Sequence, residues 1–195
     1  MSSLTERWQS QPIPNLRKWL LEKNSESPFG ITEDELHDFR GILIQGSLHQ
    51  IEIEKIDFSE ASMKVAQFAA TVRGCCFVKC NFDGSMGNKF VDCNFQQAKV
   101  SDCGFYGRFF NCSFLKARLI NVRGSELKFE ECDFTGANLR KSSYYDSTFL
   151  RCKFVNCKLG MGSFAGSKFE DCEIEGVDFS KTVMNRVKGI ELDEG

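Results

Sequence analysis

The chain has 195 residues, 42% of them hydrophobic, and a formal net charge of −2, which is the size and composition of one domain. The charge is divided: residues 39–188 sum to +4, whereas residues 1–38 and 189–195 each sum to −3. This mildly basic, mixed body lacks the dense positive patch that phosphate backbones require, so we expect no direct nucleic-acid binding. No apolar run is long enough to span a bilayer, and no membrane-spanning segment is expected.

The N-terminal segment does not resemble a secretion signal. Residues 1–30 lack a continuous apolar stretch, and Pro12 and Pro14 interrupt them. Without an export signal, the ten cysteines are expected to be thiols in a reducing compartment rather than a disulfide framework. The sequence therefore predicts a cytoplasmic protein.

Residues 1–38 are predicted to form a short α-helical cap. Asn15, which follows Pro14, can cap a helix over residues 16–23, and a turn is expected at 33–37. Since the ends of a solenoid expose apolar core and unpaired strand edges, such ends need a cover. We expect four apolar residues to cover the N-terminal end: Trp8, Leu16, Trp19 and Leu20.

Within the predicted repeat region, residues 39–188, the chain carries a large apolar residue, here called the centre, at nearly every fifth position between Leu43 and Met184. The longest unbroken run of centres is Phe114, Leu119, Gly124, Phe129, Phe134, Leu139, Tyr144, Phe149, Phe154, Leu159, Phe164, Phe169, Ile174, Phe179 and Met184, with Gly124 as its exception. A period of five fits neither a helix nor a strand. It predicts a chain that turns a corner after each short segment and returns to the same edge after four.

A small or thiol side chain stands two positions before most centres, and a short polar residue often stands between them, as in Cys132-Asp133-Phe134. Residues two apart in an extended segment point to the same side, so the centre and the small residue are predicted to point inward. The chemistry repeats best at every fourth unit, which predicts a square coil with stacked sides. One such ladder consists of Cys112, Cys132, Cys152 and Cys172 beside Phe114, Phe134, Phe154 and Ile174.

The regular spacing of the centres slips three times, between Phe68 and Phe77, between Phe82 and Phe90, and between Phe105 and Phe114. We expect a tightened or distorted corner at each slip. The segment Asp83, Gly84, Ser85, Met86, Gly87 and Asn88 holds two glycines and is predicted to be a small loop or bulge. Because loops on rigid scaffolds often carry recognition, this segment is the candidate docking loop.

Residues 189–195 form a C-terminal tail. Beyond the last centre only Val187, Ile190 and Leu192 remain, among charged residues. This is a thin cover, so the terminal coil could pair with a second copy of the chain in a homodimer.

The repeat resembles that of a known family. Cys132-Asp133-Phe134-Thr135-Gly136 and Ala137-Asn138-Leu139-Arg140-Lys141 are similar to the A(D/N)LXX unit of the pentapeptide-repeat proteins, and Cys80-Asn81-Phe82 and Cys93-Asn94-Phe95 match in the same way. The resemblance covers most of the region 39–188. It implies an all-β fold, the right-handed quadrilateral parallel β-helix. Leu127 and Gly162 depart from the consensus at small positions, and Gly124 at a centre.

The family resemblance also suggests a function. Its best-understood members, quinolone-resistance and topoisomerase-toxin immunity proteins, resemble a DNA duplex in shape and charge and bind a bacterial type II topoisomerase. The basic body of this chain argues against full transfer, because a duplex mimic should be acidic along one surface. We therefore expect a non-enzymatic scaffold that binds a macromolecular partner, an unidentified protein, through its outer faces. The alternative is a DNA-mimicking modulator or protector of a type II topoisomerase.

A third class, a thiol-based redox or metal protein, rests on the cysteines. Ladder thiols that recur at every fourth unit point the same way and do not converge on a metal, so core packing is expected, with no metal site and no cofactor. Cys76, next to Cys75, is predicted to point outward, as an inert or a reactive surface thiol. His37 and His49 have no nucleophile at a motif spacing, and no enzymatic activity is expected.

Overall fold

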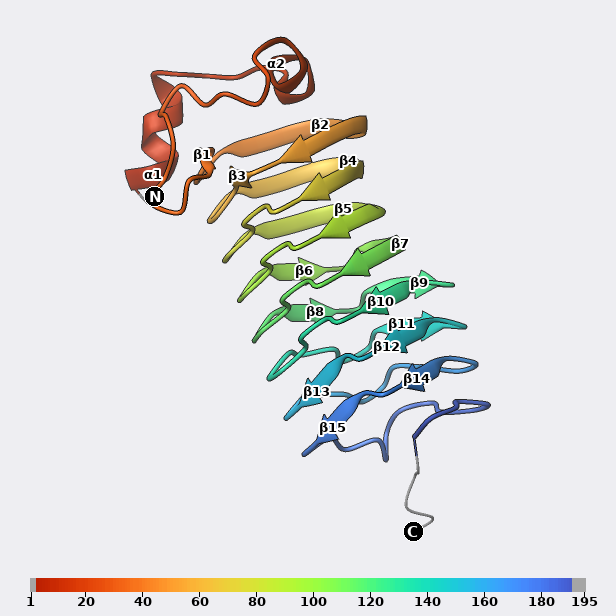
Figure 1. The fold of residues 1–195 in the computed structure, drawn as a ribbon. Coiled ribbons are helices and arrows are strands. Elements are labelled where there is room, and N and C mark those ends of the chain that lie inside the picture. The colour runs from red at the N-terminus through yellow and green to blue at the C-terminus, as the bar shows by residue number, and fades with distance from the viewer. Residues whose placement is uncertain (1–2, 191–195) are drawn as a thin grey trace.

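The computed structural model describes residues 3–190. It begins with helix α1 (Ser3–Glu6), the single 3₁₀ turn η1 (Arg7–Gln9) and helix α2 (Leu16–Glu22). The predicted helix at 16–23 is confirmed by α2, and the side-chain oxygen of Asn15 accepts a hydrogen bond from the Lys18 N–H at 3.0 Å, as an N-cap should. Helix α2 packs against the first long strand, at the top of the solenoid in Figure 1.

The rest of the described chain is a ladder of parallel strands. These are β1 (His37–Asp38), β2 (Leu43–Glu54), β3 (Ile56–Asp57), β4 (Ser62–Arg73), β5 (Asn81–Val91), β6 (Lys99–Ser101), β7 (Gly104–Phe110), β8 (Arg118–Ile120), β9 (Arg123–Ser125), β10 (Lys128–Glu130), β11 (Ser143–Tyr145), β12 (Thr148–Leu150), β13 (Lys153–Val155), β14 (Lys168–Glu170) and β15 (Glu173–Glu175). Figure 1 shows the coils stacked in chain order from the helical cap downward. The predicted right-handed quadrilateral parallel β-helix is the fold of this chain.

Each coil copies the one before it. From residue 113 on, strand residues pair with the residue four units later, as in Phe129↔Phe149 and Phe149↔Phe169. One complete coil has a first side (residues 132–136), a second side (137–141), a third side (142–146) and a fourth side (147–151). These four terms are used below for the equivalent segments of every coil.

Left-handed residues two positions after most centres make the corners. In one coil these are Lys116, Asn121, Glu126 and Glu131, with φ between 54° and 57° at all four corners. The short polar residue before the centre supports the turn, because its side-chain oxygen accepts a backbone N–H two residues on. Asp133 accepts from Thr135 at 2.8 Å, and Asn94 accepts from Gln96 at 2.9 Å.

Aromatic stacks fill the interior. On the first side, rings stack from Phe95 through Phe114 and Phe134 to Phe154 with centroids 5.0 Å apart at each step. On the fourth side, Phe109, Phe129, Phe149 and Phe169 stack at 4.8–5.1 Å. Rings of the two stacks meet edge to face, so each aromatic side chain is held by contacts along the axis and across it.

The cysteine ladder lies beside the first-side stack. Cys112, Cys132 and Cys152 are buried, and Cys172 at the C-terminal end is half-buried. Each thiol points at the carbonyl two residues earlier, at 3.3–3.5 Å. The ladder extends further than the sequence indicated, because Cys75 and Cys93 continue it and Phe39, Phe58 and Phe77 continue the ring stack beside it.

At the slip between Phe68 and Phe77 a corner is straightened rather than tightened. At the other two slips the corners are kept but distorted, as expected: Gly84 has a φ of 123°, Asn88 of 96° and Gly107 of 88°, against 54–57° at the regular corners named above.

In the N-terminal coils the second, third and fourth sides merge into long strands, β2 and β4 of 12 residues and β5 of 11. Among the described residues of β4, none has a positive φ. With the corner residue deleted, the strand continues, and Val72 pairs with Phe90 across a shorter coil than the one that separates Phe129 from Phe149.

The predicted docking loop is not a loop. Asp83–Asn88 lies inside strand β5, and the irregularity is a register shift in its neighbour β4, between Lys64 and Gln67. Gly87 allows strands β5 and β7 to approach each other closely, because a Cβ there would overlap the Tyr106 carbonyl of β7. This glycine therefore marks tight packing between coils rather than a chain reversal.

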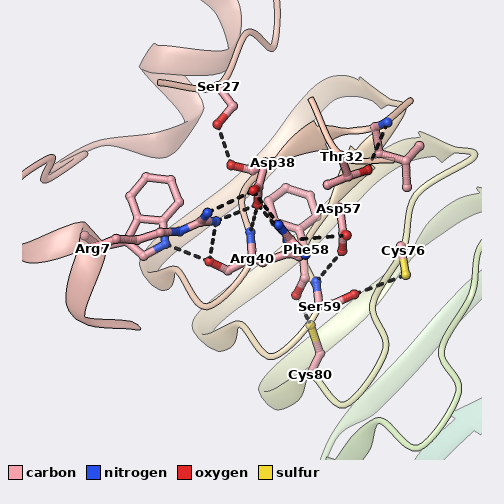
Figure 2. Close-up of polar contacts among 12 residues, drawn as sticks. Arg7, Ser27, Thr32, Asp38, Arg40, Asp57, Phe58, Ser59, Cys76 and Cys80 are labelled. Carbon is pink, nitrogen blue, oxygen red and sulfur yellow. Dashed lines mark hydrogen bonds and ion pairs between the residues drawn. The ribbon is translucent and has the colours of Figure 1, made fainter. Parts of the chain in front are cut away.

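An ion cluster fastens the helical cap to the first coil (Figure 2). The Asp38 carboxylate, 4% exposed, accepts hydrogen bonds from Arg7 at 2.5 and 2.9 Å and from Arg40 at 2.8 and 3.0 Å. Arg7 also lies over the Phe29 ring at 4.2 Å. Trp8 stacks on Phe39 at 5.8 Å and donates from Nε1 to the Arg40 carbonyl, so the cap ends the first-side aromatic stack.

The pKa of Asp38 reflects its ion pairs with the two arginines. Burial alone would raise the pKa, but the hydrogen bonds from Arg7 and Arg40 outweigh burial and hold it well below its usual range. A carboxyl with a depressed folded-state pKa stabilises the fold above its unfolded pKa of about 4, and this contribution is lost as the pH falls further.

The first prediction concerns Asp38. We expect Asp38→Asn to weaken the docking of the cap by about 3 kcal/mol, because two guanidinium groups lose their buried partner. Both tryptophans of the chain, Trp8 and Trp19, lie in the cap, so urea unfolding followed by tryptophan fluorescence measures it directly. In the wild type, the same fluorescence change should begin below about pH 4.

The control for this variant is Glu173→Gln, which breaks an exposed pair with Lys153 and should cost less than about 1 kcal/mol. Equal effects of the two substitutions would contradict the role of Asp38.

The second prediction concerns the missing centre at position 124. A Cβ on Gly124 would lie 2.5 Å from Leu127 Cδ1 and 2.8 Å from the Phe105 carbonyl, so Leu127 fills the space of the absent side chain. Gly124→Ala should cost about 1–3 kcal/mol through overpacking. Combining it with Leu127→Ala should cost less than the two single changes together by about 1 kcal/mol.

Far-UV circular dichroism in urea measures this coupling, with the exposed Ser125→Ala as a variant of little effect. Strict additivity of the two changes would show that the positions do not compensate each other.

Candidate binding surface

The thiols offer little chemistry at the surface. Cys76 points outward on the first side, as predicted, but it is only half-exposed, and its sulfur lies 3.2 Å from Ser59 Oγ (Figure 2). Burial raises the pKa of the Cys76 thiol, and it raises those of Cys80 and Cys112 much further. All ten cysteines are free, and no group of residues within 3–190 is arranged to hold a metal ion.

The two histidines lie apart from any such chemistry. His37 is half-buried in β1, and His49 is exposed on β2, where its carbonyl accepts a hydrogen bond from Arg17 at 2.9 Å. Within the described span, no helix is both long enough and apolar enough to cross a bilayer.

The outer surface is organised in columns, because strand register places equivalent outward residues above one another about 4.8 Å apart. The second side carries Lys99, Arg118, Asn138 and Lys158 in one column. The fourth side carries Lys89, Arg108, Lys128, Thr148, Lys168 and Lys188. The first side is mixed, with Asp133, Lys153 and Glu173 in succession.

A groove lies along the fourth side, over strands β4, β5, β7 and β10. Its volume is about 480 Å³. One wall is the column of Lys89, Arg108 and Lys128, which we call the basic column. Val91 and Phe110 also line the groove and are called its apolar floor below. Phe110 is one of the few large apolar side chains left exposed, at 37%.

The ends of the groove differ in charge. Arg73, in register with Val91 and Phe110, closes the end nearer the cap. Glu130 follows in the same column at the other end, where Arg151 holds its carboxylate at 2.6 Å. The groove is therefore cationic along its length and at one end, and the acid among its lining residues is already paired.

The candidate docking segment at 83–88 belongs to the same strand as Lys89 but lies earlier along it. Met86 and Gly87 of that segment are buried, which places them beyond the reach of a partner, while Asn88 is exposed. The groove lies at the end of the strand that holds this segment, after the predicted docking residues. The signal present in the sequence was a basic residue directly before the fourth-side centres Phe90, Phe109 and Phe129.

A second hollow, of about 740 Å³, lies at the C-terminal end of the core. It is lined by Cys172, Ile174, Val177, Met184 and Ile190, among others. The predicted C-terminal cover by Val187, Ile190 and Leu192 falls partly outside the described residues, since the structure describes nothing after 190. Val187 and Ile190 are partly buried against the core.

The five-residue units, four-sided coils and stacked interior together define a class, the pentapeptide-repeat solenoids. Sequence comparison agrees with the fold. The family profile for a pentapeptide repeat region matches residues 125–194, and that for pentapeptide repeats in 8 copies matches residues 108–141. Residues 108–194 therefore match the pentapeptide-repeat family, and the solenoid as a whole has the fold of that family. No curated protein sequence matches it.

Solved structures of the same family are similar to the chain. QnrB1, a plasmid-mediated fluoroquinolone resistance protein, aligns with a TM-score of 0.50 at 15% identity over 77% of this chain and 78% of its own. HetL, a protein involved in heterocyst differentiation regulation from the cyanobacterium Nostoc sp. strain PCC 7120, aligns at 0.43 and 10% identity over 80% and 90%. Rfr23 from the cyanobacterium Cyanothece 51142 aligns at 0.33 and 12% identity over 86% and 97%.

The third prediction concerns thiol labelling. In the native protein Cys76 and Cys172, the two half-exposed cysteines, should react with iodoacetamide before the eight buried ones. Both should react slowly compared with a free thiol, because the pKa of each is raised. Mass spectrometry of tryptic peptides gives the order.

Labelling in denaturant, where all ten should react alike, is the control. A fast reaction at Cys112 or Cys132 in the native protein would contradict the buried ladder.

Proposed function

We propose that this chain is a non-enzymatic scaffold that binds another protein through its outer sides. The observation that carries this proposal is that the interior is filled by side chains, whereas the outer sides present ordered columns of charged and apolar residues. Stacked side chains occupy the coils, whereas the fourth side presents an exposed aromatic ring among unpaired cations. Recognition residues on a rigid frame bind without much ordering cost, which suits a scaffold.

The alternative, modulation of a type II topoisomerase by duplex mimicry, has less support. A duplex mimic needs a continuous acidic surface, since it occupies a site built for phosphates. Here the second and fourth sides carry basic columns, and Lys153 separates Asp133 from Glu173 on the first side. The likeness to QnrB1, at 15% identity, supports the shared fold and leaves the partner open.

The proposal extends to the cellular location and the oligomeric state of the protein. Ten cysteines without a disulfide among them suit a reducing compartment, and we place the protein in the cytoplasm. A homodimer through the terminal coil remains a prediction, for which sedimentation velocity is the direct measurement.

The fourth prediction separates the two partner classes. Added in excess to a DNA gyrase supercoiling assay, with and without a fluoroquinolone, the protein should change neither supercoiling nor drug inhibition. Photo-crosslinking in the native host, with a crosslinking amino acid on the fourth side, should capture a protein reproducibly. The matched control carries the crosslinker on the third side.

Protection or inhibition of gyrase at stoichiometric protein would instead support duplex mimicry. No captured protein from any side would overturn the scaffold proposal.

A further inference from the structure

We propose that the groove on the fourth side binds a short acidic segment of a partner protein, one that carries two or more carboxylates around an apolar or aromatic side chain. This inference rests on the proposed function, since it assigns the surface and the chemistry of the partner. It depends on three features of the groove: its unpaired cations, its apolar floor and its limited length.

The cations of the groove have no partners of their own. Within residues 3–190, no ion pair involves Arg73, Lys89, Arg108 or Lys128, although eight ion pairs occur elsewhere. Lys89, Arg108 and Lys128 are all exposed and lie on three successive coils in direct register. Like charges directly opposite each other in a sheet are destabilising, so an anion that neutralises all three would bind favourably.

The apolar floor of the groove favours a ligand that carries an apolar side chain as well as negative charge. Val91 and Phe110 lie in register on β5 and β7, two residues along each strand from the basic column. Residues two apart on a strand face the same way and are about 7 Å apart. A ligand lying along the solenoid axis can therefore place carboxylates on the basic column and an apolar side chain on Phe110 at once.

The length of the groove fits a peptide. Lys89 and Lys128 are two coil spacings apart, about 10 Å, and carboxylates on alternate residues of an extended peptide are about 7 Å apart. Two or three carboxylates can thus reach the three flexible cationic side chains. Arg73 offers a further cation at the end nearer the cap.

A nucleic acid fits less well, because it would continue along the axis over acidic groups. Glu52 and Glu54 follow in register next to Thr71 and Arg73 on one side of the groove. At the other end Glu130 lines the groove, and beyond it Lys168 is already paired with Glu170 at 2.6 Å. The run of three successive cations ends with the groove, because Thr148 follows Lys128 in the column, whereas phosphate-backbone binding requires a longer positive track.

Fluorescence anisotropy tests the proposal with the full-length chain. The probe is a fluorescein-labelled peptide of sequence Glu-Asp-Phe-Asp-Glu, compared with Gln-Asn-Phe-Asn-Gln and with an oligothymidylate of similar length. We expect the acidic peptide to bind best of the three. Its affinity should fall as salt is raised from about 50 mM to about 200 mM, because screening weakens exposed charge pairs.

Variants locate the site. Arg108→Glu should weaken the acidic peptide about tenfold or more, about 1.4 kcal/mol, and Phe110→Ser should weaken it less but measurably. The matched control is Arg118→Glu, the same charge reversal on the second side, which should change the affinity less than about twofold. All three positions are exposed or outward-facing, and circular dichroism verifies that the variants fold.

Three outcomes would overturn the inference: equal weakening by Arg108→Glu and Arg118→Glu, equal binding of the amide peptide, or tighter binding of the oligothymidylate. If the peptide fails while crosslinking still captures a protein, the acidic-segment inference falls and the scaffold proposal stands. If the peptide binds as predicted but crosslinking captures nothing, the groove chemistry stands and the scaffold proposal falls.

Discussion

The constraint on which this structure depends is direct contact between equivalent side chains on successive coils. Parallel strands in register place each ring over the ring of the preceding coil, and centroids 4.8–5.1 Å apart leave no room between them. A coil is therefore held in position by its neighbours rather than by distant parts of the chain, as in other repeat proteins. The cap obeys the same constraint, since Trp8 takes the place that a further ring would have above Phe39.

Departures from the repeat are tolerated where a neighbouring departure balances them. Gly124 lacks a centre side chain, and Leu127, too large for its small position, occupies that space. Each corner likewise depends on the residues at that corner alone. A regular corner has one left-handed residue. Where that residue is absent, as along β4, the chain continues as a longer strand and pairs with β5 across a shorter coil, with one register shift between Lys64 and Gln67.

The sequence alone was sufficient for the fold because the period of five can be read without knowing any neighbour. The sequence was not sufficient for residues whose structural role depends on contacts with the coil above or below. Phe39 stands before the regular centres, and its place between Trp8 and Phe58 in the ring stack follows only once the cap is docked. Gly87 was interpreted as loop-forming because its close approach to Tyr106 appears only once β5 and β7 are paired. The basic column was missed for the same reason, since Lys89, Arg108 and Lys128 are far apart in the chain, and only the strand register brings them together.

That register makes the basic column informative. Strand register stacks the outward residues of a solenoid as well as its core residues. Cations on successive coils therefore repel one another, and this repulsion does not contribute to the stability of the fold. Further along the fourth side this repulsion is relieved, because Thr148 interrupts the column and Glu170 pairs with Lys168. Among the residue columns within 3–190, it is beside Phe110 that unpaired cations lie on three successive coils. A surface that is electrostatically unfavourable in isolation, and apolar at its centre, is most simply explained by the anionic partner that would make it favourable.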